Sequence, residues 1–209
     1  TGKITREDYD FMREKMAWLQ RLNLKEVESD VDGEYMIPPQ ALNGKKTLIK
    51  CVLPDKLEVI GRGAFGGTSL TGSVLLPEGL RYVSGFNNTK ITNVLFPNSL
   101  EEIGGGMGDD MYGGNTGGTG EGAFGCCSSL MAEISLPQGL RKIGSGAFYR
   151  SAIKGNLVLP HNLESIGEQA FAECSGLTGS LVIPDKIEVI LYETFRSCGF
   201  TGTLTLPKG

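Results

Sequence analysis

The sequence predicts a strand-rich solenoid of about eight turns, built from a repeated unit and preceded by a helix. The first observation is a set of prolines that each follow an apolar–x–apolar triplet, about 23 residues apart except for one shorter and one longer interval: Pro54, Pro77, Pro97, Pro137, Pro160, Pro184 and Pro207. The second is the glycine content, 31 of 209 residues, about twice the usual share of roughly 7%. Corners that recur in every turn account for such an excess of glycine.

The chain begins with a predicted helix from Thr5 to about Leu19. Thr5 is a suitable N-cap, and Asp8 stands three residues later, as in a capping box. One face of this helix is apolar: Tyr9, Met12, Met16 and Leu19. We interpret residues 1–18 as a capping helix that covers the first repeat, with a partner-binding helix as the alternative.

Residues 19–209 carry the repeat, and the best copy extends from Leu163 to Pro184. Its pattern is L-x-x-I-G-x-x-A-F-x-x-C-x-x-L-x-G-x-L-x-I-P. The last part alternates with period 2, as a half-buried strand does, and proline ends it. Leu-x-x-Ile forms a second short inward-facing segment, and the glycine after it occupies a corner where a Cβ atom would be unfavourable. The expected parallel strands lie near 22–24, 51–53, 74–76, 94–96, 134–136, 157–159, 181–183 and 204–206.

Each repeat needs its neighbours, because a single unit cannot bury its apolar face. The N-terminal helix would close one end of such a stack, but no comparable segment closes the other end. We therefore expect the natural protein to continue beyond Gly209, or another chain to cover that end.

The repeat pattern resembles the BspA-like, or Treponema-type, leucine-rich repeat family over roughly residues 19–209. This resemblance implies the α/β leucine-rich-repeat class, with a right-handed strand-rich solenoid. It also implies a bacterial cell-surface protein of the Bacteroides type, displayed at the surface or secreted, that adheres to host proteins or to other cells. The motif is specific for the repeat class and says little about the ligand.

Two segments lengthen individual repeats. The first is a glycine-rich insertion at residues 104–122, in which Asp109 and Asp110 are conceivable calcium ligands and a loop at one corner is the simpler interpretation. The second is the acidic stretch at residues 29–34, which is too short for an EF-hand loop and is expected to be a surface loop.

Three cysteines, Cys127, Cys174 and Cys198, stand three residues after the repeat phenylalanine, where other repeats carry Thr68 or Ser151. A position that accepts Cys, Ser or Thr is small, partly polar and inward-facing, so buried free thiols are the main interpretation. A Cys174–Cys198 disulfide between neighbouring turns and a metal site are the alternatives.

Catalysis has little support in the sequence. His161 is the single histidine, it follows a strand-ending proline, and no oriented nucleophile or second base accompanies it. The net charge of −4 argues against a nucleic-acid partner, and no apolar run reaches the length of a membrane-spanning helix. We therefore expect no enzyme activity, no cofactor and no catalytic or metal-binding residues.

One face of the strands is a candidate binding surface. The outward residues in the middle of the triplets are mostly apolar and would form a stripe along the solenoid: Val52, Leu75, Leu95, Ser135, Val158, Val182 and Thr205. An exposed apolar stripe can mark an interface, although simple strand propensity would also explain it. Two residues earlier stands a mostly polar row that could hydrogen-bond a ligand or simply contact water: Lys50, Ser73, Asn93, Glu133, Asn156, Ser180 and Thr203.

A further repeat position carries charges whose sign alternates over the first five turns: Glu58, Arg81, Glu101, Arg141, Glu164 and Glu188. We interpret this ladder as an aid to the stacking register and not as a binding site.

Taken together, these patterns predict a non-catalytic binding protein that mediates protein–protein contacts or cell adhesion through a repeated face. The expected partner is a host or other-cell surface protein, or a glycan. A glycan-binding surface protein and a structural spacer that presents a neighbouring domain are the alternatives.

Overall fold

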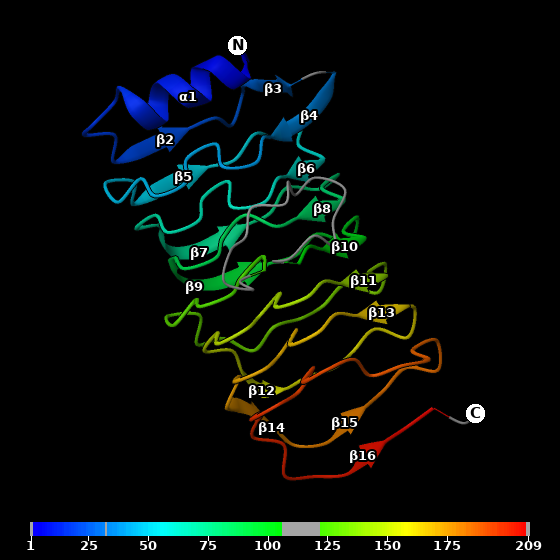
Figure 1. Ribbon diagram of the computed structural model, residues 1–209. Helices are drawn as coiled ribbons and strands as arrows, with labels where there is room; N and C mark the ends of the chain where they lie inside the picture. The colour runs from blue at the N-terminus through cyan, green and yellow to red at the C-terminus, as the bar shows by residue number, and fades with distance from the viewer. Residues whose placement is uncertain (1, 32, 106–121, 208–209) are drawn as a thin grey trace.

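The computed structural model of the chain describes residues 2–31, 33–105 and 122–207. Within these ranges the chain winds into a solenoid of about eight turns, with one helix at its N-terminal end (Figure 1). The predicted solenoid with parallel strands is therefore confirmed. Asp109 and Asp110, the conceivable calcium ligands, lie outside the described residues.

An eight-stranded sheet runs along one side of the solenoid in the order β1-β3-β4-β6-β8-β10-β11-β13 (Figure 1). From β6 onward it is built from the second inward-facing segment of each repeat, so the short Leu-x-x-Ile segments pair from turn to turn. All neighbouring strands are parallel except β3 and β4. The strands are β1 (Lys3–Ile4), β3 (Glu28–Val31), β4 (Glu34–Ile37), β6 (Val59–Ile60), β8 (Tyr82–Val83), β10 (Glu102–Ile103), β11 (Lys142–Ile143) and β13 (Ser165–Ile166).

Four pairs of parallel strands make up a second side of the solenoid, away from the eight-stranded sheet (Figure 1). The pairs are β2 (Arg21–Asn23) with β5 (Lys50–Val52), β7 (Thr71–Leu75) with β9 (Lys90–Leu95), β12 (Lys154–Asn156) with β14 (Gly176–Thr178), and β15 (Leu181–Val182) with β16 (Leu204–Thr205).

The expected strands at 134–136 and 157–159 are wrong, because neither segment is paired as a strand. The chain pairs earlier in these turns, where β12 and β14 join Lys154 to Gly176. The backbone N–H of Lys154 donates to the carbonyl of Ala132 at 3.1 Å, so a backbone contact continues across the break.

The N-terminal helix α1 (Arg6–Glu14) starts as predicted and ends earlier than predicted. The backbone N–H of Thr5 donates to Asp8 Oδ2 at 2.8 Å, which forms the expected capping box. Tyr9 and Met12 are buried in the main core, so the helix covers the first turn. Met16 lies beyond the helix and is 39% exposed, because the chain leaves the helical path at Lys15 to reach β2.

The acidic stretch at residues 29–34 was expected to be a surface loop, and this expectation is wrong. Its two ends belong to β3 and β4, which form an antiparallel ribbon. Val31 and Met36 of this ribbon pack with Val59 and Tyr82 in a small second cluster of buried residues. The buried Ser29 accepts or donates a 2.8 Å hydrogen bond with the Tyr9 hydroxyl, which ties the ribbon to α1.

The main core contains one stack of aromatic rings. The repeat phenylalanines lie nearly parallel, with centroids 5.1–5.7 Å apart: Phe65, Phe86, Phe124, Phe148, Phe171 and Phe195. Such offset or stacked pairs add to the stabilisation that burial provides. The phenylalanine of each turn therefore holds its neighbours in register.

The corner around each phenylalanine is joined to the next turn by backbone hydrogen bonds. Phe148 N–H donates to the Ala170 carbonyl at 2.8 Å, and Arg150 N–H donates to the Ala172 carbonyl at 3.0 Å. Arg150 adopts the left-handed region with φ of 54°. The corner thus satisfies its backbone polar groups without forming a regular strand.

Candidate functional site

Five residues of the candidate stripe lie on paired strands, Ser135 and Val158 lie in the unpaired segments between them, and all seven side chains are exposed. Leu75 is 71% exposed and is the register partner of Leu95 in β9. Val182 is the register partner of Thr205. Ser135 interrupts the apolar surface between Leu95 and Val158, so the stripe consists of two aliphatic segments.

Part of the polar row beside the stripe already bonds within the protein. Asn93 Oδ1 accepts the Val94 N–H at 2.9 Å, and Ser180 Oγ accepts the Thr203 N–H at 3.0 Å. Asn93 lies in β9 just after the bulge, and Ser180 directly precedes β15, so both bonds hold the backbone at irregular points of this face.

Sequence reasoning missed a column of positive charges at the other edge of the same face. Four of the paired strands begin with an exposed cation, and together these form the cationic column: Arg21, Lys50, Lys90 and Lys154. Arg21 and Lys50 are direct register partners. The signal was present in the sequence, because a cation precedes the outward strand residue by two to five positions in each of these repeats.

The charge ladder lies on the eight-stranded sheet, and several of its charges are paired. Arg81 Nη2 lies 3.2 Å from Glu58 Oε2, and Arg141 Nε lies 3.5 Å from Glu164 Oε1. These contacts join neighbouring turns, which agrees with the predicted role in stacking. Ion pairs of this kind leave little free charge for a ligand.

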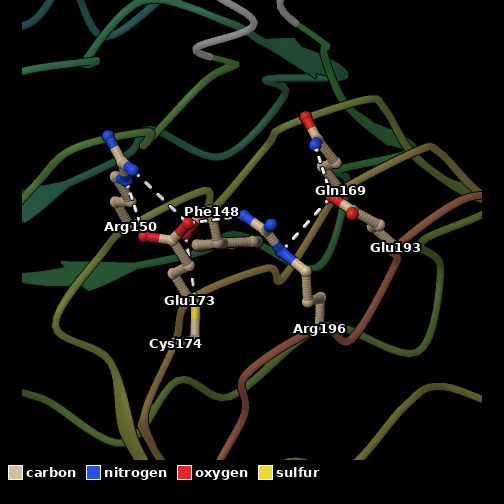
Figure 2. A network of polar contacts seen from close by, with 7 residues as sticks. All are labelled: Phe148, Arg150, Gln169, Glu173, Cys174, Glu193 and Arg196. Atoms are coloured by element: carbon tan, nitrogen blue, oxygen red, sulfur yellow. Dashed lines mark hydrogen bonds and ion pairs between the residues drawn. The ribbon is translucent and has the colours of Figure 1, made fainter.

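A second network of paired charges lies at the phenylalanine corners (Figure 2). Glu173 bridges two turns, because its carboxylate contacts Arg150 Nε at 2.6 Å and also the guanidinium of Arg196. Glu193 accepts from Gln169 Nε2 at 2.8 Å. The hydrogen bond from Arg150 holds the pKa of Glu173 below its usual value. The charges of two arginines and two glutamates neutralise one another here, and their contacts link neighbouring turns.

The cysteines beside the phenylalanine stack are free thiols. Cys174 Sγ donates to the Phe148 carbonyl at 3.0 Å, and Cys198 Sγ donates to the Phe171 carbonyl at 3.1 Å. Burial raises the pKa of Cys174 to about 12 and that of Cys198 to about 11. The buried-thiol interpretation is therefore confirmed for Cys127 and Cys174, whereas Cys198 is a free thiol that is only partly buried, and the Cys174–Cys198 disulfide is not present.

His161 is exposed, and its Nδ1 lies 3.0 Å from Gln138 Oε1. Among residues 2–31, 33–105 and 122–207, His, Cys, Asp and Glu nowhere gather in a group of three or more that could hold a metal ion. Within the same described residues, α1 falls short of the length and apolarity that a bilayer-spanning helix needs.

Comparison with known protein families identifies the repeat type. A family model described as the BspA type leucine rich repeat region matches the chain in six copies, over residues 35–107 and 117–209. The two ranges cover well over half of the chain. A search of the curated proteins finds no match.

The solved structures that match this chain include a leucine-rich repeat protein from Bacteroides ovatus ATCC 8483. It is 20% identical, with a TM-score of 0.53, over 80% of this chain and 44% of that chain. A leucine rich cell surface protein from Faecalibacterium prausnitzii A2-165 is 16% identical, with a TM-score of 0.40, over 96% of this chain and 62% of that chain. The chain thus spans less than two thirds of the length of both proteins. At such identities the likeness to the Bacteroides ovatus protein shows the fold alone.

Proposed function

The chain belongs to the BspA-type leucine-rich repeat family, and on this premise we propose that it is a non-catalytic binding protein. In this proposal the protein is displayed at the bacterial surface or secreted, and it contacts a protein of a host or of another cell. The stripe is the contact surface. Affinity would come from an extended face and not from one deep pocket.

The observation that carries this proposal is the exposure of aliphatic side chains at the same position of successive turns. Leu75 is 71% exposed, Val158 is 61% exposed and Val182 is 57% exposed. Their neighbours Leu76, Leu157 and Leu181 are buried, so the outward residues are not needed to complete the core. Solvent-exposed aliphatic residues that align along a surface are typical of protein–protein interfaces.

The other charged surfaces fit a binding role less well. The ladder on the eight-stranded sheet and the network at Glu173 are built from contacts between turns. The thiols are protonated and bonded to backbone carbonyls. These groups stabilise the stack and are engaged within the protein, whereas the side chains of the stripe are free to contact a partner.

The decisive experiment measures binding of the purified chain to a panel of immobilised matrix proteins and glycans. We expect saturable binding to at least one protein of the panel, and a variant with Leu75, Leu95, Val158 and Val182 changed to serine should lose it. A matched variant with Val189 and Tyr192 changed to serine, which alters exposed residues away from the stripe, should bind normally. Undiminished binding by the folded stripe variant would place the site elsewhere.

A structural spacer is a second candidate, and the continuous phenylalanine stack favours it. A core in which the turns from Phe65 to Phe195 are fixed to one another by stacked rings and backbone hydrogen bonds would resist bending. A spacer would show no saturable binding in the same panel. Selective binding of glycans alone would favour the glycan-binding alternative.

A further inference from the structure

The strand face combines two features that lie side by side. Along the strands, the cationic column stands at the start and the stripe stands two to five residues later, as with Lys50 and Val52 on β5 or Lys90 and Leu95 on β9. A rise of about 3.3 Å per residue places the two features roughly 7–16 Å apart. A partner that covers the stripe would therefore also reach the column.

The cations of the column are not neutralised by any acid among the residues that the structure describes. Arg21, Lys50, Lys90 and Lys154 form no ion pair with an acid of the described residues, whereas Arg81, Arg141, Arg150 and Arg196 all do. Like charges at facing strand positions, as in Arg21 and Lys50, destabilise a sheet. The chain carries a net charge of −4, so this local excess does not follow from its composition.

Acidic residues are nearly absent from this face. In the segments that form it, residues 21–23, 50–52, 71–75, 90–95, 131–135, 154–158, 176–182 and 201–205, Glu133 is the single acid. Its side chain lies against Gly155 of β12, next to Lys154 in the chain, and the side chains of Glu133 and Lys154 form no ion pair. The face thus presents an aliphatic surface beside a cationic edge.

The spacing of three members of the column, Lys50, Lys90 and Lys154, fits an extended chain, whereas Arg21 lies in the turn next to Lys50. Lys50 and Lys90 are two turns apart, with Thr71 of β7 between them, and Lys90 and Lys154 are also separated by one intervening turn. Neighbouring turns lie about 4.8 Å apart, so each interval is roughly 10 Å. Three residues of an extended polypeptide in the polyproline II conformation rise about 9 Å and return the side chain to the same face, whereas residues three apart in a β-strand point to opposite faces.

From these observations we propose that the face binds an extended acidic segment of a partner protein, with acidic residues about three positions apart and aliphatic residues between them. The carboxylates pair with the column, and the aliphatic side chains cover the stripe. This inference rests on the proposed function and adds the chemical class of the partner. The aliphatic stripe favours a polypeptide over an anionic polysaccharide, because a charged polysaccharide offers no apolar side chains to cover it.

The test uses synthetic 15-residue peptides and the whole chain. The probe is a Glu-Leu-Ser repeat, and the controls are a Gln-Leu-Ser repeat and a peptide of the same composition with all glutamates at one end. We expect the regular acidic peptide to bind at least about tenfold more tightly than either control, and to weaken when the NaCl concentration rises from about 0.05 M to about 0.5 M. Equal affinity for all three peptides would overturn the proposal.

Matched charge-reversal variants locate the contact. Lys50→Glu, Lys90→Glu and Lys154→Glu together should weaken peptide binding at least about tenfold. The matched variant carries Lys25→Glu, Lys56→Glu and Lys186→Glu, which change the net charge by the same amount in the loops that follow β2, β5 and β15. This variant should have little effect on peptide binding. Equal loss in both variants, with both folded by circular dichroism, would show a nonspecific charge effect and overturn the proposal.

The outcomes separate this inference from the proposed function. If the stripe variant loses a protein of the matrix panel while column reversal changes nothing, the stripe binds a partner of another chemistry and only the acidic-segment proposal fails. If heparin or anionic phospholipid vesicles bind more tightly than the peptide and depend on the same lysines, the column serves a polysaccharide or a membrane, and the proposal is overturned. If neither variant affects any bound protein, both proposals fail.

Discussion

The rings of Phe148 and Phe171 stack with their centroids 5.3 Å apart and their planes 7° apart, although 23 residues separate them in the chain. The distance between stacked rings is close to the distance between neighbouring turns. One aromatic residue per turn is therefore enough to form a continuous column. The repeat period of the sequence therefore places one phenylalanine in each of these turns, at the spacing that ring stacking requires.

Replacing Phe148 with alanine should remove a fully buried ring from the middle of this column. We expect the free energy of unfolding to fall by about 3–5 kcal/mol, because a cavity would remain between Phe124 and Phe171. Urea denaturation followed by circular dichroism measures the change. Phe11→Ala on the exposed side of α1 is the control, and a loss of similar size there would show that ring burial is not the cause.

Replacing Gly167 with alanine should disturb the contact between two turns. A Cβ atom at this position would collide with the backbone of Ser145 in the preceding turn. We expect a loss of about 1–3 kcal/mol in the free energy of unfolding, because the neighbouring backbone must move. An unchanged melting temperature would mean that the turns can separate at no cost.

Substitutions at two left-handed corner residues should change the free energy of unfolding in opposite directions. Ser197 has φ of 55° and Gly44 has φ of 71°, and the position of a Cβ atom on Gly44 is open. Ser197→Gly should therefore stabilise the protein by up to about 1 kcal/mol, whereas Gly44→Ala should destabilise it by about 1 kcal/mol. Thermal denaturation of both variants tests the prediction, and shifts in the same direction would refute it.

The buried thiol of Cys174 should make stability decline at high pH. Its pKa is raised from 9.0 to about 12 by burial, so the folded state keeps the thiol protonated while the unfolded state ionises near pH 9. The contribution is complete below pH 9 and falls by about 1.4 kcal/mol per pH unit above it. Denaturation at about pH 8 and about pH 10 measures the slope.

Cys174→Ser is the matched variant for this effect, because Ser151 occupies the same slot in the preceding turn. Its stability should depend less on pH over the same interval. The same slope in the variant and the natural chain would assign the effect to other groups. Alkylation in denaturant without a reductant should label all five cysteines, since all are free.

The sequence predicted the parts of the fold that repeat. The period, the inward residues and the small polar slot all follow from which side chains a turn must bury, and this requirement is local. Strand pairing depends also on the facing turn, which a single repeat does not encode. For this reason the irregular segment at 134–136 and the antiparallel pairing of β3 with β4 were not foreseen.

The candidate face was predicted only in part. Alternation along a strand indicated which residues point outward, so the positions of Leu75 and Leu95 could be inferred. The cationic column was missed because its members share no single repeat position: Lys90 precedes Leu95 by five positions and Lys154 precedes Val158 by four. The β-bulge at Gly72 and Ser73 is one local cause of this variable offset.

The backbone hydrogen bonds between turns at the phenylalanine corners all point in the same direction along the solenoid axis. At each corner the amide belongs to the earlier turn and the carbonyl to the later one, as in Phe148 to Ala170 and Phe171 to Thr194. The peptide dipoles along this edge therefore add, as they do along an α-helix. One edge of the solenoid is a polar axis whose partial positive charge points toward the last turn, so its two ends differ electrostatically even where their side chains are alike.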